Sequence, residues 1–515
     1  MKHAIMSFIL ALLFLLASPI TMGTTGQQNE DFDPLVDIEV TIDINEIRTL
    51  EKTDLGITSI DKIDLRSDPD FYVKLIVNEE EYVSDTWENT KYLYDTPFSV
   101  TVNVPDEKEI VDITIQLWDA NPSGDVLCDL SNNWYSYDEN FDVDLQYSIK
   151  TGHWFGEDSV NHDIGWYYPD ESGYGRLNGC DDGSIYQSNK DCELLFDIYQ
   201  NDYDSDGIPY WTEVNVYGTD PTVDNRGEDA DEDGVPIEWE HKWGHFMYEN
   251  WRDGSIQHHW FYDPFEWEDH ENLDPDGDSL TNIEEYKTSQ WESDPYREDL
   301  FVELDQMEAG PDGQPASMLP EDSKELLRTA YNKQNLVYHL DDGRWDETGS
   351  EMIPFDEETT MSWDGMDNEL QQIYEDYFLH NDEDNWRRGV FHYGVVVYQC
   401  SAANGNAFGS NRYQISYKGL SEKKNTLPWL DLDVVFASAY MHECGHSLGI
   451  INPGVDDQDG KYPWQLDWWK WLPYRSVMNY GYMFRMVDYS DGSRGMNDFD
   501  DWDDLDLTYF DTSDW

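Results

Sequence analysis

Between residues 33 and 200, apolar and polar positions follow the period of β-strands. The segments FYVKLIV (71–77), FSVTVNV (98–104) and VDITIQLWD (111–119) are rich in β-branched and aromatic residues, and turn-forming residues separate them. In a strand, alternate side chains point to opposite faces of the sheet, so that one face can be buried. The pattern predicts an antiparallel β-sandwich over residues 33–200.

The pattern changes between residues 201 and 297. Aspartates recur at short intervals, and short helical stretches such as IPYWTEVNVYG (208–218) and LTNIEEYKTSQW (280–291) follow them. Because this segment repeats a local motif, we expect a repeat segment without a hydrophobic core of its own.

From residue 298 to residue 515, predicted strands alternate with predicted helices. Strands are expected at 300–307, 336–341 and 389–399, and helices at 320–334, 366–380 and 430–450. Such alternation is typical of an α/β domain, and the apolar run at 389–399 indicates a strand buried on both faces. The Asp-rich stretch after residue 486, with its interleaved aromatic residues, is expected to form a lower subdomain with a final helix.

The chain is extremely acidic. Its 515 residues include 110 acidic and 31 basic ones, which gives a formal net charge of −79. Aromatic residues make up 15% of the chain, more than a disordered chain would carry, so most of it should fold. The charge disfavours binding to nucleic acid or to bare anionic lipid, and it favours calcium or a saline medium.

The first residues have the layout of an export signal. Lys2 and His3 precede an apolar run from Ala4 to Ala17, and small residues continue to Gly23. A run of this length is too short to span a bilayer comfortably, and a retained membrane anchor is the alternative. We expect residues 1–23 to be a signal peptide and the protein to be secreted, or held at the cell surface.

The last predicted helix carries side chains that can bind a metal. It ends in HECGH, in which His442 and His446 are four residues apart and Glu443 follows the first histidine. Residues at this spacing share one helical face, so both imidazoles can reach one zinc ion at ~2.0–2.1 Å. Zinc lowers the pKa of a bound water to about 7, and Glu443 is placed to take the proton of that water.

A second motif, SVMNY at 476–480, together with HExxHxxG resembles the metzincin peptidases, which combine this zinc motif with a Met-turn. The resemblance covers residues 299–515 and implies an α/β zinc endopeptidase. It implies that Met478 forms an apolar floor under the zinc and that Tyr480 stabilises the oxyanion or swings on and off the metal. Ordinary core packing is the alternative for both residues. Gly449 allows the chain to leave the helix and turn back.

The third zinc ligand departs from the family pattern. Where these peptidases have His or Asp, this sequence has Asn452, whose neutral amide oxygen is a weak zinc ligand. Three solutions are open: Asn452 binds weakly, Asp456 or Asp457 reaches back from the following loop, or the site has lost zinc. We favour Asp456, because its oxygen is anionic and the Pro-Gly pair at 453–454 can redirect the chain.

Three windows of twelve residues within 201–297 share one spacing of acidic residues. Each has Asp at positions 1, 3 and 5 and Glu at position 12, and position 6 is Gly207, Gly234 or Ser279. Oxygens at these positions can wrap one Ca²⁺, and glycine at position 6 makes the sharp turn. The candidate calcium ligands are Asp202, Asp204, Asp206 and Glu213; Asp229, Asp231, Asp233 and Glu240; and Asp274, Asp276, Asp278 and Glu285.

These windows resemble thrombospondin type 3 or dockerin-like repeats. Pro209 and Pro236 stand where an exit helix would begin, a favoured position for proline, and GTDP follows at 218–221. The resemblance implies a rigid spacer stapled by calcium, and chance clustering in an Asp-rich chain is the alternative. Without Ca²⁺ the clustered carboxylates would repel one another and loosen the segment.

Four aspartates, Asp68, Asp70, Asp119 and Asp125, lie at the ends of the predicted strands 71–77 and 111–119 or just beyond them. With these positions, residues 33–129 resemble a C2 domain, which holds calcium between loops at one end of a β-sandwich. The resemblance implies contact with a lipid, a polysaccharide or another surface through Ca²⁺. A plain sandwich with acidic loops is the alternative.

These observations predict a secreted zinc metallopeptidase that hydrolyses proteins or peptides and is stabilised by calcium. Two other classes of function stay open. Because Asn452 departs from the family pattern, the chain could be an inactive calcium-binding protein of the cell surface, with a role in adhesion. Alternatively, the calcium-binding regions could carry a matrix-binding function to which proteolysis is incidental.

Overall fold

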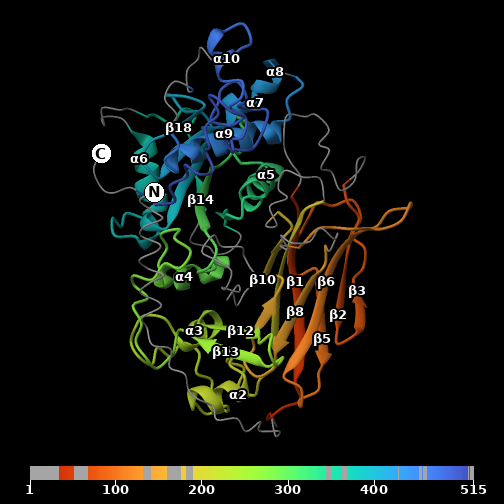
Figure 1. Ribbon diagram of the computed structural model, residues 1–515. Coiled ribbons are helices and arrows are strands. Elements are labelled where there is room, and N and C mark those ends of the chain that lie inside the picture. The colour runs from red at the N-terminus through yellow and green to blue at the C-terminus, as the bar shows by residue number, and fades with distance from the viewer. Residues whose placement is uncertain are drawn as a thin grey trace.

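The chain forms three structural regions that follow one another along the sequence (Figure 1). This computed structural model describes residues 34–50, 68–131, 141–158, 175–180, 190–343, 350–361, 368–426, 428–451, 455, 461–508 and 510. The proposed signal peptide lies outside these residues. In the part that is described, no helix has the length and apolar character that crossing a bilayer requires.

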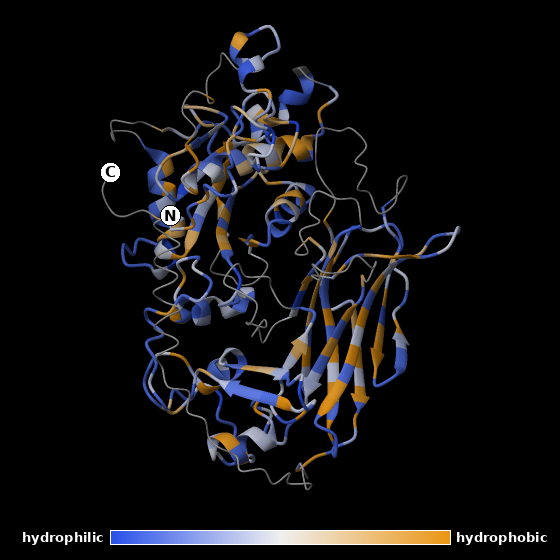
Figure 2. Ribbon diagram, in the orientation of Figure 1, coloured by the Kyte–Doolittle hydropathy of each residue, from blue (hydrophilic) through white to orange (hydrophobic). Residues whose placement is uncertain are grey.

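The first region is a sandwich of two antiparallel sheets. One sheet has the order β10 (Gly175–Asn178), β11 (Cys192–Gln200), β1 (Glu39–Thr49) and β4 (Tyr92–Leu93), with β5 (Phe98–Asn103) also paired to β1. The other has the order β3 (Glu80–Val83), β2 (Phe71–Val77), β6 (Ile110–Asp119), β8 (Val143–Ser148) and β9 (Trp154–Gly156), with β7 (Val126–Leu127) on β6. Apolar residues alternate with polar ones along these strands (Figure 2). The predicted antiparallel sandwich is confirmed.

The middle region consists of short helices and one hairpin. They are α2 (Tyr210–Thr212), η1 (Glu213–Tyr217), α3 (Ile237–Trp243), β12 (His245–Glu249), β13 (Ile256–Trp260), α4 (Asn282–Thr288) and η2 (Ser289–Trp291). The prediction that this region lacks a core is wrong. Trp239 and Trp243, four residues apart on α3, pack with Val235, Tyr262 and Tyr296. The apolar partners come from separate loops, so no periodic pattern in the sequence announces them.

The third region is a mixed sheet with helices on both faces. The strand order is β15 (Val337–Asp341), β14 (Asp299–Met307), β17 (Phe391–Val397), β19 (Arg412–Ser416) and β18 (Gly405–Ala407), with β16 (Met352–Ile353) on β14. All pairs are parallel except β18 with β19. The helices are α5 (Glu321–Asn332), α6 (Glu369–Ile373) with η3 (Tyr374–Phe378), η4 (Trp386–Gly389), α7 (Tyr417–Ser421), α8 (Lys423–Thr426), α9 (Leu432–Ser447) and α10 (Leu466–Lys470). The predicted α/β architecture is confirmed.

Helix α9 lies deep in the core of this region. Val435, Ala439 and Tyr440 pack in one cluster with residues of the central sheet such as Leu304 and Tyr413. A helix that is buried nearly all round carries apolar residues on every side, which explains the continuous run VVFASAYM. The end of α9, with its two histidines, is therefore fixed by tight packing rather than by surface contacts.

The expected final helix is absent from the described residues after α10. Instead, the acidic side chains of this stretch accept hydrogen bonds from nearby backbone, as Asp491 does from Ser493 at 3.0 Å and Asp506 from Thr508 at 3.0 Å. Such local bonds compete with helix formation. The stretch is held by Trp502, whose ring packs edge-on against that of Tyr331 on α5. The predicted helix is wrong because these side-chain-to-backbone hydrogen bonds favour turns over a helix.

Buried charges dock the sandwich onto the α/β region. Arg48 on β1 donates to Glu325 on α5 at 2.6 Å, and Arg328 donates to the other oxygen of Glu325 at 2.8 Å. Burial raises the pKa of Glu325, but Arg48 and Arg328 more than offset it and lower the pKa to about 2. The carboxylate is therefore charged at ordinary pH. Arg48, Glu325 and Arg328 are all buried where the two regions meet.

Candidate active site and cation-binding loops

The end of α9 brings two imidazoles and one carboxylate together. His442 and Glu443 are 2% and 4% exposed, and His446 is partly exposed. One ligand atom from each of the three lies within 4.8 Å of the others. The two rings are 4.9 Å apart at an interplanar angle of 84°. The spacing of four residues thus produces the convergence that the sequence predicted.

Backbone carbonyls fix the orientation of both histidines. Nδ1 of His442 donates to the carbonyl of Val477 at 2.9 Å, and Nδ1 of His446 donates to the carbonyl of Ile450 at 3.1 Å. With Nδ1 occupied as a donor, Nε2 of each ring keeps its lone pair for a metal. Burial, reinforced by the neighbouring His446, lowers the pKa of His442 to about 3, so this imidazole is neutral. These residues fit a zinc ion.

Gly449 ends the helix in the way that the site needs. Its φ of 78° lies in the left-handed region that favours glycine. The N–H of Ile450 donates to Gly445 at 2.9 Å and that of Gly449 to His446 at 3.3 Å, the paired bonds of a Schellman turn. This turn carries the Ile450 carbonyl back to the ring of His446.

The turn that contains Met478 packs directly against the helix. A Cβ added to Gly445 would lie 2.8 Å from Sδ of Met478, so glycine at this position permits the close approach. The side chain of Asn479 fixes the turn by donating to the carbonyls of Trp471 and Tyr474 at 3.0 and 2.8 Å. The ring of Tyr480 lies 5.6 Å from that of His442. Met478 and Tyr480 therefore lie beside the two histidines.

The candidates for a third zinc ligand, Asn452, Asp456 and Asp457, lie outside the described residues. The identity of this ligand stays a prediction.

A short edge strand also borders the site, and the sequence analysis missed it. A Cβ added to Gly405 on β18 would overlap the carboxylate of Glu443. Among the described strands, β18 pairs with β19 alone, so its other edge has backbone groups available for a further strand. With only three residues, this strand has no periodic signal by which the sequence could reveal it.

The three acidic windows fold into loops with the same local design. In each loop the aspartate at position 1 accepts hydrogen bonds from the backbone N–H groups at positions 4 and 6. The residues at these two positions have positive φ: Ser205 and Gly207, Glu232 and Gly234, and Gly277 and Ser279. Ser279 adopts the left-handed conformation, with φ of 81°, that glycine has in the other two loops.

Several carboxylate oxygens in these loops are buried without a hydrogen-bond donor. They belong to the residues at position 3, Asp204, Asp231 and Asp276, and to Glu240 and Glu285 at position 12. Burial and neighbouring carboxylates raise the pKa of Glu240 to about 10, which shows how costly a second negative charge is there. Buried carboxylates of this kind are usually neutralised by a cation. The loops therefore fit cations.

The four aspartates of the C2-like region lie at one end of the sandwich. Asp119, at the end of β6, accepts from the backbone N–H of Asp70 at 3.0 Å, and Asp125 accepts from the hydroxyl of Tyr72 at 3.0 Å. Asp68 lies 3.7 Å from the ammonium of Lys91. Hydrogen-bond donors and a lysine of the protein thus contact three of these aspartates. Calcium binding at this end of the sandwich stays a prediction.

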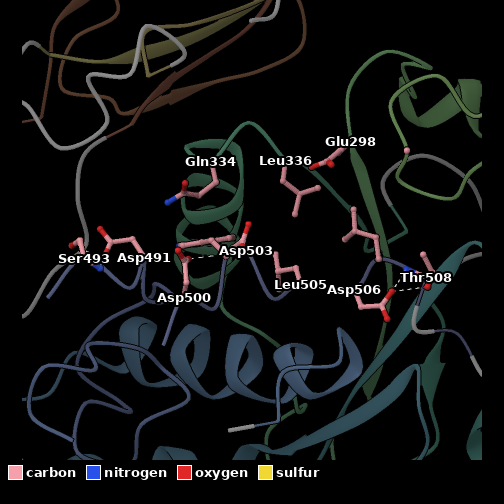
Figure 3. Close-up of a pocket in the computed structure, with 13 residues that line it drawn as sticks. Glu298, Gln334, Leu336, Asp491, Ser493, Asp500, Asp503, Leu505, Asp506 and Thr508 are labelled. Carbon is pink, nitrogen blue, oxygen red and sulfur yellow. Dashed lines mark hydrogen bonds between the residues drawn. The ribbon is translucent and has the colours of Figure 1, made fainter. Parts of the chain in front are cut away.

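A pocket of about 850 Å³ is shown in Figure 3, and neither His442 nor His446 is among its lining residues. Acidic residues from the C-terminal stretch line it, and Figure 3 shows Gln334 and Leu336 across from them. The acidic side chains are Glu298, Asp491, Asp500, Asp503 and Asp506. Its lining residues include no histidine, so it lacks the pair of imidazoles found at the end of α9, and its volume does not make it the candidate active site.

No protein-family model matches the chain, and no curated protein matches it. Among solved structures, the chain is similar to a C2 domain at 9% identity over 31% of this chain and 97% of that one, with a TM-score of 0.17. The first C2 domain of plant extended synaptotagmin 1 gives 11% identity over 32% and 94%, with a TM-score of 0.18. The paired C2 domains of extended synaptotagmin 2 give 12% over 34% and 45%, with a TM-score of 0.18. The N-terminal part is therefore weakly similar in structure to C2 domains.

Proposed function

We propose that this protein is a zinc-dependent endopeptidase of the metzincin type, acting outside the cell. The observation that carries the proposal is the pair of imidazoles, His442 and His446, whose Nδ1 atoms are both held by carbonyls. Their Nε2 atoms are left for a metal, next to the carboxylate of Glu443. The export-signal pattern of the first residues supports an extracellular location.

The residues of the site have separable roles. Zinc, when bound, would acidify a coordinated water and polarise the carbonyl of the peptide bond. Glu443 takes the proton from the attacking water and then delivers it to the leaving nitrogen. Tyr480, beside His442, stabilises the negative charge that develops on the carbonyl oxygen. Met478 supports the end of the helix from below through its contact at Gly445.

The free edge of β18 supports a binding mode for the substrate. An extended peptide can add to an exposed sheet edge through main-chain hydrogen bonds, largely without regard to sequence. Since Gly405 on β18 adjoins Glu443, a peptide bound there would pass the catalytic carboxylate. This supports an endopeptidase that accepts unfolded chains.

Replacing Gly405 with alanine should displace the Glu443 carboxylate, because the added Cβ would overlap it. We expect a fall in kcat/KM of roughly tenfold to a hundredfold, as a displacement of about 1 Å can cause, with unchanged zinc content. Hydrolysis of an unfolded, fluorescently labelled protein and elemental analysis of the same sample would measure both.

The matched control is Gly389→Ala, since a Cβ at Gly389 would meet no atom within 4 Å. This variant should keep full activity. Equal activities for Gly405→Ala and Gly389→Ala would show that β18 does not position the carboxylate.

Removing zinc tests the proposed function itself. A chelator selective for zinc over calcium should abolish hydrolysis of an unfolded protein, and stoichiometric zinc should restore it. Purified, folded protein that holds no transition metal and cleaves no polypeptide would instead favour the inactive, calcium-binding surface protein.

The remaining regions support a calcium-dependent framework around the enzyme. In the first and third loops the groups that could hold a cation consist of aspartates, a hard oxygen set that suits Ca²⁺. The acidic end of the sandwich, at Asp70, Asp119 and Asp125, is where a calcium-mediated contact with a lipid or another surface would form. Binding of the intact protein to vesicles with and without Ca²⁺ would test that contact.

A further inference from the structure

A histidine and a glutamate from another part of the chain reach the second acidic loop. Glu268 and His270 follow the β12–β13 hairpin and lie beside Asp233 and Glu240, the residues at positions 5 and 12 of this loop. One ligand atom of each of the four side chains lies within 4.8 Å of the others. The twelve-residue window therefore contains only part of this cluster.

The imidazole of His270 points into the carboxylates. Its side chain is 0% exposed, and its Nε2 lies 3.2 Å from Oδ2 of Asp233 and 3.8 Å from Oε1 of Glu240. The rings of Trp239 and Tyr262 meet it edge-on, with centroids at 5.6 and 4.8 Å. The packing thus holds Nε2 toward the carboxylate group and leaves little room for another orientation.

Several buried polar atoms at this loop make no hydrogen bond, although Nε2 of His270 lies at ion-pair distance from Asp233. They are Nε2 of His270, Oε1 of Glu240, Oε2 of Glu268 and both carboxylate oxygens of Asp231. A buried polar atom without a partner is costly. A protonated His270 would neutralise the charge of only one of the four carboxylates of Asp231, Asp233, Glu240 and Glu268. A divalent cation bound among them would instead contact both carboxylate oxygens and the ring nitrogen.

The ligand set favours a transition metal over calcium. Ca²⁺ takes six to eight oxygen ligands, whereas imidazole suits zinc and other first-row metals. We propose that Asp233, Glu240, Glu268 and His270 bind a first-row transition-metal dication such as Zn²⁺ or Mn²⁺. At this one loop the proposal replaces calcium, and it does not depend on whether Glu443 hydrolyses peptides.

A histidine that binds a metal through one ring nitrogen usually donates a hydrogen bond from the other. Asn282 lies beside that other nitrogen, Nδ1 of His270. Its side-chain amide lies 2.8 Å from Nδ1 of His270, and its Oδ1 is buried without a donor. An amide turned by 180° occupies the same space and presents Oδ1 instead. In the metal-bound state Nδ1–H then donates to this oxygen, and the lone pair of Nε2 faces the metal.

The test counts metal ions in the intact protein. Protein stripped of metal is refilled with Zn²⁺ in the presence of a large excess of Ca²⁺, passed through gel filtration and analysed for both elements. Wild type should hold one more zinc per chain than His270→Gln, and both should hold the same calcium. Glu268→Gln, which keeps the histidine and changes one oxygen ligand, should also hold less zinc.

The matched control is His339→Gln. His339 is likewise paired with a carboxylate, at 2.6 Å from Oδ1 of Asp299, but it is not a member of the cluster. Its loss should leave the zinc count unchanged. Circular dichroism establishes that each variant is folded, and if His270→Gln does not fold, Glu268→Gln decides.

Three results would overturn the proposal: equal zinc in wild type and both cluster variants, displacement of this zinc by calcium, or no metal at the loop, which would make His270 and Asp233 an ion pair only. The same count shows separately whether the site on α9 also binds zinc. If α9 binds zinc, the count falls from two to one on loss of His270, and if α9 does not, it falls from one to none.

Discussion

Glu443→Gln is expected to lower the hydrolysis of an unfolded protein by roughly 10²–10⁴-fold, the usual contribution of a general base, while zinc content stays the same. The amide of glutamine has nearly the shape of the carboxylate but cannot take a proton from water. Zinc content should hold because His442 and His446 are oriented by the carbonyls of Val477 and Ile450. Initial rates on labelled unfolded protein, with elemental analysis, measure both quantities.

Glu422→Gln is the matched control, because Glu422 is exposed between α7 and α8 and the chemical change is the same. It should leave both activity and zinc unchanged. Retained cleavage by Glu443→Gln would rule out the proposed base. Loss of zinc together with activity would instead assign Glu443 to holding the site together.

Selective removal of calcium is expected to lower the melting temperature by about 10–20 °C before zinc is lost. A site at 100 times its Kd adds about 2.7 kcal/mol, and about 1 kcal/mol moves the midpoint of a large domain by roughly 2–4 °C. Two calcium loops, the first and the third, therefore account for the shift. Without the ion, the buried carboxylates of each loop repel one another.

Through the third loop, loss of calcium should also affect the α/β region. Asp278 accepts from the backbone N–H of Asp299, the first residue of β14, at 2.9 Å. Loss of calcium should thus loosen the junction with the central sheet, whereas His442 and His446, the proposed zinc ligands on α9, are held by separate contacts. Calorimetry with a calcium-selective chelator, followed by zinc analysis at each temperature, measures the order of events.

The variant Asp278→Asn should reproduce part of the calcium effect, and Asp384→Asn, at an exposed position outside the loops, should not. A melting curve that is the same with and without calcium would contradict the assignment of the loops.

Features set by neighbouring residues could be predicted from the sequence. The pairing of His442 with His446 follows from the pitch of a helix, and the loops follow from the spacing of carboxylates within twelve residues. The strands of the sandwich follow from alternation with period two. In each case the chemistry and the geometry lie within a short stretch of chain, so the residue order alone determines them.

Contacts between distant parts of the chain were decided only by the tertiary structure. The carbonyl of Val477 orients a histidine 35 positions earlier, and Gly405 borders Glu443 from another strand. His270 contacts the second acidic loop, whereas the sequence pattern placed all the predicted ligands of that loop within twelve residues. Such contacts depend on the path of the whole backbone and on which surfaces pack together. Neither a period nor a motif spacing carries that information, because both describe only how a segment relates to itself.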